Sequence, residues 1–173
     1  MADMDSWATS PRAITRDEHL GFEAPVLKLA CDTWIATAKG GIPTRSQFTA
    51  RTVKPFVSNV VIFERREIDY FIRLMGTRIT STLGEMQGKT LREALPEDAV
   101  IRWATELDHV LDIHKPIRVV TKVQLNHLHF LDAELFMGPM TDEHGKECMV
   151  LAAVVFSSGL RPPPSVADII GNQ

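Results

Sequence analysis

Two stretches of the chain place apolar residues at helical spacing. Residues 98–114 give the clearest pattern, because the stripe positions recur at alternating steps of four and three residues: Val100, Ala104, Leu107, Leu111 and His114. Residues 24–39 show a similar pattern, with Pro25 suited to a first helical turn and Gly40 acting as a stop signal. Each stretch predicts a helix whose apolar face must be covered by another part of the structure.

Other stretches change to a period of two, which is typical of strands. Residues 117–126 and 129–140 alternate apolar and polar side chains. Residues 58–64 and 68–75 are rich in β-branched and aromatic residues and flank a polar turn, as in a hairpin. Residues 147–158 are apolar at nearly every position, which indicates a central strand covered on both faces. The pattern therefore predicts five strands.

Short helices are expected between these elements. Thr49–Phe56 has helical character, and residues 77–83 are expected to form a helix capped by Thr77. The Thr90-x-x-Glu93 pattern predicts a capping box that opens another turn. The element order predicts an α+β fold, in which a five-stranded antiparallel sheet carries helices on one face and is flanked by the N-terminal helix. That leader helix is expected to mask the other face or to pair two subunits.

Composition and charge narrow the possible functions. A chain of 173 residues fits one domain. The net charge of −3 offers no electrostatic footprint for nucleic acid or an acidic membrane surface. The first residues lack the basic start and apolar run of a signal peptide, and no apolar run reaches the roughly 18 residues that span a bilayer. We therefore expect a cytoplasmic protein without nucleic-acid or membrane partners.

The region from the second strand to the short helices carries a recognisable motif set. An aromatic-x-Arg-x-x-Gly-Thr strand end is followed by Gly-x-x-x-Gly and Leu-x-Glu, and upstream a Trp precedes Gly-x-Pro-x-Arg. These positions are supplied by Trp34, Gly41, Pro43, Arg45, Phe71, Arg73, Gly76, Thr77, Gly84, Gly88, Leu91 and Glu93. The set resembles that of the bacterial PAS-like sensory domain family, in which a connecting helix and short helices roof a pocket above the sheet.

The resemblance implies a role and a domain layout. The family implies a non-enzymatic sensory or regulatory domain in bacterial signalling, which binds a small ligand or a protein partner and often stands alone. The layout is an N-terminal arm over residues 1–22, a leader helix over 23–42, a PAS-like domain over 43–160 and a C-terminal tail over 161–173. The Thr15-x-x-Glu18 pattern allows a helical turn in the arm. A homodimer is the expected assembly.

The predicted elements bring apolar residues together on one side of the sheet, where a ligand pocket is expected. Its expected lining is Tyr70, Ile72, Leu74, Leu107, Leu111, Val119, Thr121, Val123 and Leu135. Apolar periodicity alone does not distinguish a pocket from a fully packed core, so a core or scaffold without a ligand stays open. In the pocket interpretation the ligand is small and apolar.

Other chemical interpretations have weaker support in the sequence. The segment from Gly84 to Thr90 resembles a Walker A loop, but its spacer is three residues where the motif needs four. His127 and His129 lie close together, but no further residues complete a metal site, and we expect none. A small enzyme would have to use these histidines with Asp132 and Glu134, although both carboxylates alternate away from the expected pocket face.

The sequence also argues against bound haem or flavin. His109 lies about 200° round the predicted helix from Leu107, away from the pocket, and His114 stands at the end of that helix. Neither Cys31 nor Cys148 has the Asn-Cys-Arg context of a flavin photosensor of this fold. The expectation is therefore a domain with no cofactor.

Overall fold

Six antiparallel strands form one sheet in the computed structural model, which describes residues 14–126 and 129–157. Their order across the sheet is β1-β4-β5-β6-β2-β3, so the first and the third strands along the chain lie at its two edges. The strands are β1 (Thr15–Asp17), β2 (Val60–Arg66), β3 (Asp69–Met75), β4 (Ile117–Asn126), β5 (His129–Thr141) and β6 (Glu147–Ser157). The predicted α+β class with an antiparallel sheet is confirmed, with β1 added to the five expected strands.

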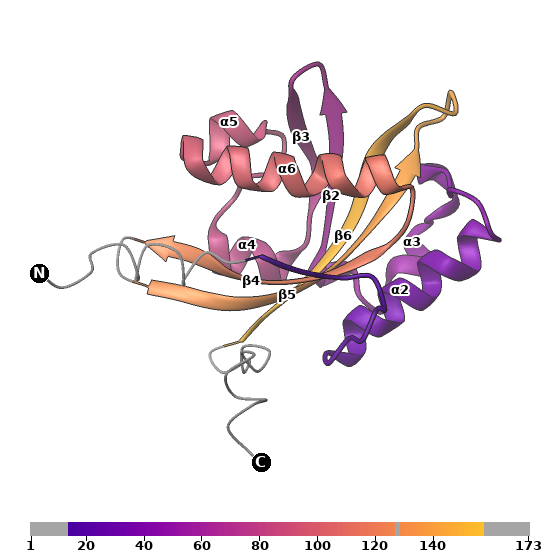
Figure 1. The fold of residues 1–173 in the computed structure, drawn as a ribbon, viewed down its shortest axis with the longest axis horizontal. Coiled ribbons are helices and arrows are strands. Elements are labelled where there is room, and N and C mark those ends of the chain that lie inside the picture. The colour runs from indigo at the N-terminus through magenta and orange to yellow at the C-terminus, as the bar shows by residue number, and fades with distance from the viewer. Residues whose placement is uncertain (1–13, 127–128, 158–173) are drawn as a thin grey trace, which may run out of the picture.

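Helices cover both faces of this sheet. Figure 1 shows α6 running across the sheet with α4 and α5 near it, while α2 and α3 lie together at the right of the view. The helices are α2 (Pro25–Ala38), α3 (Ala50–Val53), α4 (Thr77–Leu83), α5 (Leu91–Ala94) and α6 (Glu97–Ile113), with short 3-10 turns η1 (Arg45–Gln47) and η2 (Val57–Asn59). The expected capping box of Thr90 and Glu93 opens α5.

The sheet separates two apolar cores. The first core lies between the sheet and α6, where Leu107, Val110 and Leu111 are buried against strand residues. The second core lies beneath α2, which buries Leu27, Ala30, Cys31 and Trp34. The leader helix therefore covers the second face of its own sheet, which explains why β6 is apolar on both sides.

Three local expectations were wrong. Residues 15–17 form an edge strand paired with β4, where the capping pattern had suggested a helical turn. A β-bulge between Ile62 and Phe63 shifts the β2–β3 register, so Leu74 turns to the second core and leaves the face of Tyr70 and Ile72. At α4, Gly76 occupies the N-cap and Thr77 is the first helical residue.

Candidate functional site: a cavity between the sheet and the short helices

The face of the sheet that α6 covers, which we call the first face, holds a cavity of about 780 Å³. The cavity lies beneath α4, α5 and the start of α6. The strand residues that form its floor all have apolar side chains: Val61, Phe63, Ile72, Met75, Val123, Leu135, Met137, Ala152, Val154 and Phe156. Such a floor offers an apolar surface and no side-chain hydrogen bond. Affinity at this floor would come from burial of apolar ligand surface.

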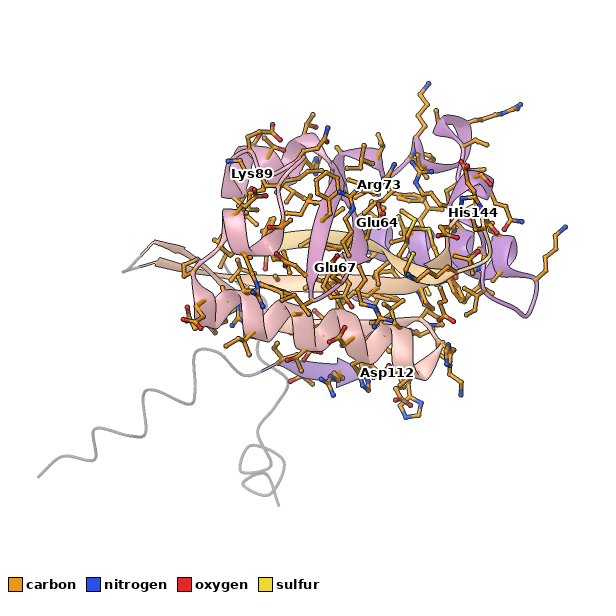
Figure 2. All side chains as sticks on the ribbon, turned by 90° about the horizontal axis from the view of Figure 1, so that it is seen from above. Glu64, Glu67, Arg73, Lys89, Asp112 and His144 are labelled. Atoms are coloured by element: carbon orange, nitrogen blue, oxygen red, sulfur yellow. The ribbon has the colours of Figure 1, made fainter. Side chains whose placement is uncertain are left out.

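The roof and rim of the cavity are mixed in character. Apolar side chains come from the short helices and the start of α6, with Ile79, Leu83, Met86, Leu91, Leu95 and Trp103 among them. The charged lining residues are Glu85, Lys89, Glu93, Asp98 and Arg102. Figure 2 shows Lys89 at the end of the molecule where the short helices lie. Charged groups therefore come from the roof and rim, and the sheet supplies apolar surface.

Ion pairs and hydrogen bonds fasten α6 over the sheet. The hydroxyl of Tyr70 in β3 donates to Asp108 in α6 at 2.5 Å, and Arg65 lies 3.5 Å from the same carboxylate. Burial, followed by this hydrogen bond, raises the pKa of Tyr70 well above its usual range, so the hydroxyl keeps its proton. Arg16 in β1 binds Glu106 through two hydrogen bonds of 2.7 and 2.8 Å. The second half of α6 is thus tied to both edges of the sheet.

The nine residues expected to line the pocket divide into three groups. Ile72, Val123 and Leu135 line the cavity. A second group is buried on the same face beside it, namely Tyr70, Leu107, Leu111, Val119 and Thr121. Leu74 packs on the opposite face. Ligand binding by these residues stays a prediction.

Sequence reasoning missed much of the true lining. Three lining residues of β6 were not predicted, namely Ala152, Val154 and Phe156. Because β6 is apolar on both faces, its sequence does not show which residues point to which face. Met86 and Leu95 lie in short connecting segments without a periodic pattern. Trp103 could have been suspected, because it is a large aromatic residue off the main stripe of its helix, and it does line the cavity.

The motif positions have mainly structural roles in this fold. A Cβ at Gly76 would overlap the backbone of Val57 and Ser58, so this position after β3 has room for glycine only. The backbone angle φ of Gly84 is +90°, a conformation that residues with a side chain rarely adopt, and the φ of Gly88 is also positive. The Nε1 of Trp34 donates to the carbonyl of Pro139 at 3.0 Å and holds α2 on β5. Arg73 differs, since its side chain is half exposed and pairs with Glu64.

The residues of the rival enzyme interpretation do not form a site among the described residues. Glu134 is fully buried and accepts hydrogen bonds from the amides of Glu23 and Ala24 and from Arg118. Asp132 pairs with Lys122 at 3.1 Å. His127 lies outside the described residues, as does the side chain of His129. Within the described part of the chain, no group of three metal-ligating side chains occurs.

The two cysteines and the two helix histidines lie away from the cavity. Cys31 and Cys148 are buried in the second core, and burial raises the pKa of the Cys31 thiol to about 11. His114 ends α6 at the surface and bonds Glu147 at 2.8 Å. His109 is not among the residues that line the cavity.

Comparison with known proteins places this geometry in a family. The family model described as "PAS domain" matches residues 23–155. None of the curated proteins compared with the chain matches it. No helix in the described residues is long and apolar enough to cross a membrane.

Several solved structures are similar to the chain at low sequence identity. A light-oxygen-voltage domain studied with a flavin analogue is 17% identical, with TM-score 0.47 over 62% of this chain and 83% of that chain. The PAS domain of BvgS from Bordetella pertussis is 18% identical, with TM-score 0.41 over 66% of this chain and 83% of that chain. A light-oxygen-voltage protein of Rhodobacter sphaeroides is 13% identical, with TM-score 0.44 over 57% of this chain and 58% of that chain.

These structures correct one prediction. The sequence argued against flavin, yet several of the similar structures are light-oxygen-voltage domains, and one is named for its flavin analogue. The absence of an Asn-Cys-Arg segment was therefore not a sufficient reason to exclude flavin. At these identities the likeness concerns the fold and does not identify the molecule that this chain binds.

Proposed function

Because the chain belongs to the PAS domain family, we propose that it is a sensory or regulatory domain in bacterial signalling that binds a small molecule in the cavity. The occupant is largely apolar, and the domain catalyses no reaction. Binding acts by favouring one state of the roof helices over another, since a ligand shifts an equilibrium only by its difference in affinity for two states.

The apolar floor carries this proposal. Ligand pockets typically measure roughly 300–1,000 Å³ and are mostly apolar with a few polar groups. The cavity, at about 780 Å³, fits this range, and its charged residues are confined to the roof and rim. A molecule with an apolar body and a polar end directed to the rim matches this arrangement, because a buried polar group without a partner would be costly.

The assembly and cellular location are further parts of the proposal. We place the protein in the cytoplasm as a homodimer. The apolar face of α2 is occupied by its own sheet, so a dimer must use another surface, such as the outer side of α2 with the exposed Leu29 and Ile35. Light scattering coupled to gel filtration measures the mass in solution directly.

Native mass spectrometry tests ligand binding. The purified protein is expected to carry a small molecule that is lost on denaturation, and a visible absorption spectrum shows whether that molecule is a flavin. Ala152→Phe places a phenyl ring in the cavity and is expected to abolish retention, because Ala152 is a floor residue. Ala36→Phe, at an exposed position of α2, is the matched control.

Two outcomes contradict the proposal. One is a wild-type mass equal to that of the bare chain under native conditions. The other is equal retention by wild type and Ala152→Phe, provided that both variants melt as cooperatively as wild type.

A further inference from the structure

The connection between α4 and α5 forms one wall of the cavity. We call residues 84–90 the strap, and Figure 1 shows this connection between the two helices. None of residues 84–89 is buried. Four of them nevertheless line the cavity, namely Gly84, Glu85, Met86 and Lys89. The strap therefore lies between the cavity and solvent.

The strap is attached to the sheet unevenly along its length. At its far end, the amide of Gly88 donates to the carbonyl of Ile72 at 2.8 Å, and the amide of Ile72 donates to the carbonyl of Lys89 at 2.9 Å. These two bonds join the strap to β3, which is an edge strand of the sheet. Within the described part of the chain, residues 84–87 make no backbone hydrogen bond to the sheet.

A single side chain bonds this first part of the strap to the sheet. Oε1 of Gln87 accepts a hydrogen bond from the amide of Met75, the last residue of β3, at 2.9 Å. The carboxylate of Glu85 bonds within the strap, to the amide of Gln87 at 3.1 Å, and Met86 is only half-buried. Gln87 itself is exposed and is not among the residues that line the cavity. Its side chain therefore acts on the strap and not on a ligand.

The elements around the strap are anchored more firmly. Ile79 of α4 and Leu91 of α5 are almost fully buried in the first core. α6 is tied to both edges of the sheet through Tyr70 and Arg16. Segments with few buried side chains and few protected hydrogen bonds open at lower free energy than the packed elements beside them. Residues 84–87 are therefore the part of the roof that opens most readily.

Building on the ligand binding proposed above, we infer that residues 84–87 are the gate through which the ligand enters and leaves the cavity. The hydrogen bond between Gln87 and the amide of Met75 holds this gate shut. Gly84 and Gly88 flank the gate, and glycine tolerates the backbone rotations that opening requires. Because Gln87 does not line the cavity, its bond does not distinguish empty from occupied protein. The bond therefore controls the rates of entry and exit and leaves the affinity unchanged.

Stopped-flow fluorescence with N-phenyl-1-naphthylamine, a neutral apolar probe, tests the gate on protein stripped of small molecules by unfolding and refolding. In Gln87→Leu, the association and dissociation rate constants are both expected to rise about threefold to tenfold, because the hydrogen bond that closes the gate is lost. The dissociation constant is their ratio and is expected to stay unchanged. Gln87→Glu keeps an acceptor oxygen for the amide of Met75 and is expected to keep the wild-type rates. Since Gln87 is exposed, both variants are expected to fold as wild type does.

Gln47→Leu is the matched control. The side chain of Gln47 also accepts a backbone amide, that of Thr44 at 2.7 Å, but it lies in η1 and does not line the cavity. This variant is expected to leave both rate constants unchanged. Ala152→Phe fills the cavity and is expected to abolish probe binding, which assigns the probe to the cavity.

Four results would overturn the gate. The first two are wild-type rates in Gln87→Leu and equal acceleration by Gln87→Leu and Gln47→Leu. The third is equal acceleration by Gln87→Leu and Gln87→Glu. The fourth is a rise in the dissociation rate constant alone, which would make Gln87 a ligand contact.

Failure of the ligand proposal gives a different result. A probe that does not bind wild type, or that binds Ala152→Phe equally well, contradicts ligand binding in the cavity and the gate with it. Probe binding that is lost in Ala152→Phe but keeps wild-type rates in Gln87→Leu contradicts the gate alone.

Discussion

At the scale of single residues, the buried polar groups show how the second face is held in place. Glu134 has no exposed surface, yet its carboxylate satisfies two backbone amides at the start of α2. It also accepts from Arg118 at 2.7 Å, and Arg118 reaches Asp17 at 3.4 Å. A buried ion pair is costly to break from one side, because the remaining charge stays buried without its partner.

Glu134→Ala is expected to lower the free energy of unfolding by about 3 kcal/mol, since it leaves two amides without their acceptor and Arg118 with only its longer contact to Asp17. The neighbouring Asp132→Ala is the control, because its partly exposed pair with Lys122 is worth about 0–1 kcal/mol. Urea denaturation of both variants measures the difference. Equal losses would show that the Glu134 network does not anchor α2.

The same residue shows how far the sequence could be interpreted. Alternation correctly turned Glu134 away from the cavity face, but no local pattern reveals that its partners are the amides of Glu23 and Ala24. Those partners lie more than a hundred positions earlier in the chain, and only the packed fold brings them together. Similarly, the misplaced face of Leu74 followed from a bulge that periodicity does not encode.

At the scale of elements, β1 links the leader segment to the roof helix. It pairs with β4 over three residues, and its side chains reach Glu106 in α6 and Arg118 in β4. Asp17 also accepts the amides of His19 and Gly21. A strand this short depends on its side-chain contacts for its position.

β1 is expected to loosen in acid. Burial raises the pKa of Asp17, but the amides of Gly21 and His19 and the charge of Arg118 outweigh burial and leave the pKa below its ordinary value. The charged form therefore stabilises the folded strand fully above that ordinary value, about 3.9, and this stability is lost as the pH falls below it.

Hydrogen-exchange protection of residues 15–22 measures this effect. Asp17→Asn is expected to reduce protection there even at neutral pH, while protection in β6 stays unchanged. Equal protection of residues 15–22 in wild type and Asp17→Asn would show that the carboxylate does not hold the strand.

Long elements were easier to predict than short ones. The helix at 98–114 and the strand at 147–158 appear as α6 and β6 within one residue at each end. A long apolar stripe at helical spacing specifies the helix, and a continuous apolar run specifies the strand. β1, by contrast, has three residues and no period to detect, and its strand character comes from pairing with β4. Some short helices were nevertheless foreseen, with a capping box at Thr90 and without one at residues 77–83, whereas the capping pattern at Thr15 did not produce a helix.

At the scale of the whole molecule, the sheet separates the cavity on the face that α6 covers from the core beneath α2 on the other face. A ligand in the cavity would therefore contact one side of the strands, while α2 packs on the opposite side. The core of each face could be anticipated from the sequence, but the open volume could not, because periodicity does not show where packing stops.

The central claim is that a molecule occupies the cavity on the first face, and methionine methyl NMR tests it most directly. Met75 and Met137 lie in the cavity floor, whereas Met140 and Met149 are buried in the second core. Spectra are compared between protein as purified and protein stripped of small molecules by unfolding and refolding. The account predicts that the resonances of Met75 and Met137 shift while those of Met140 and Met149 stay in place. Identical spectra, or shifts confined to the second core, would contradict it.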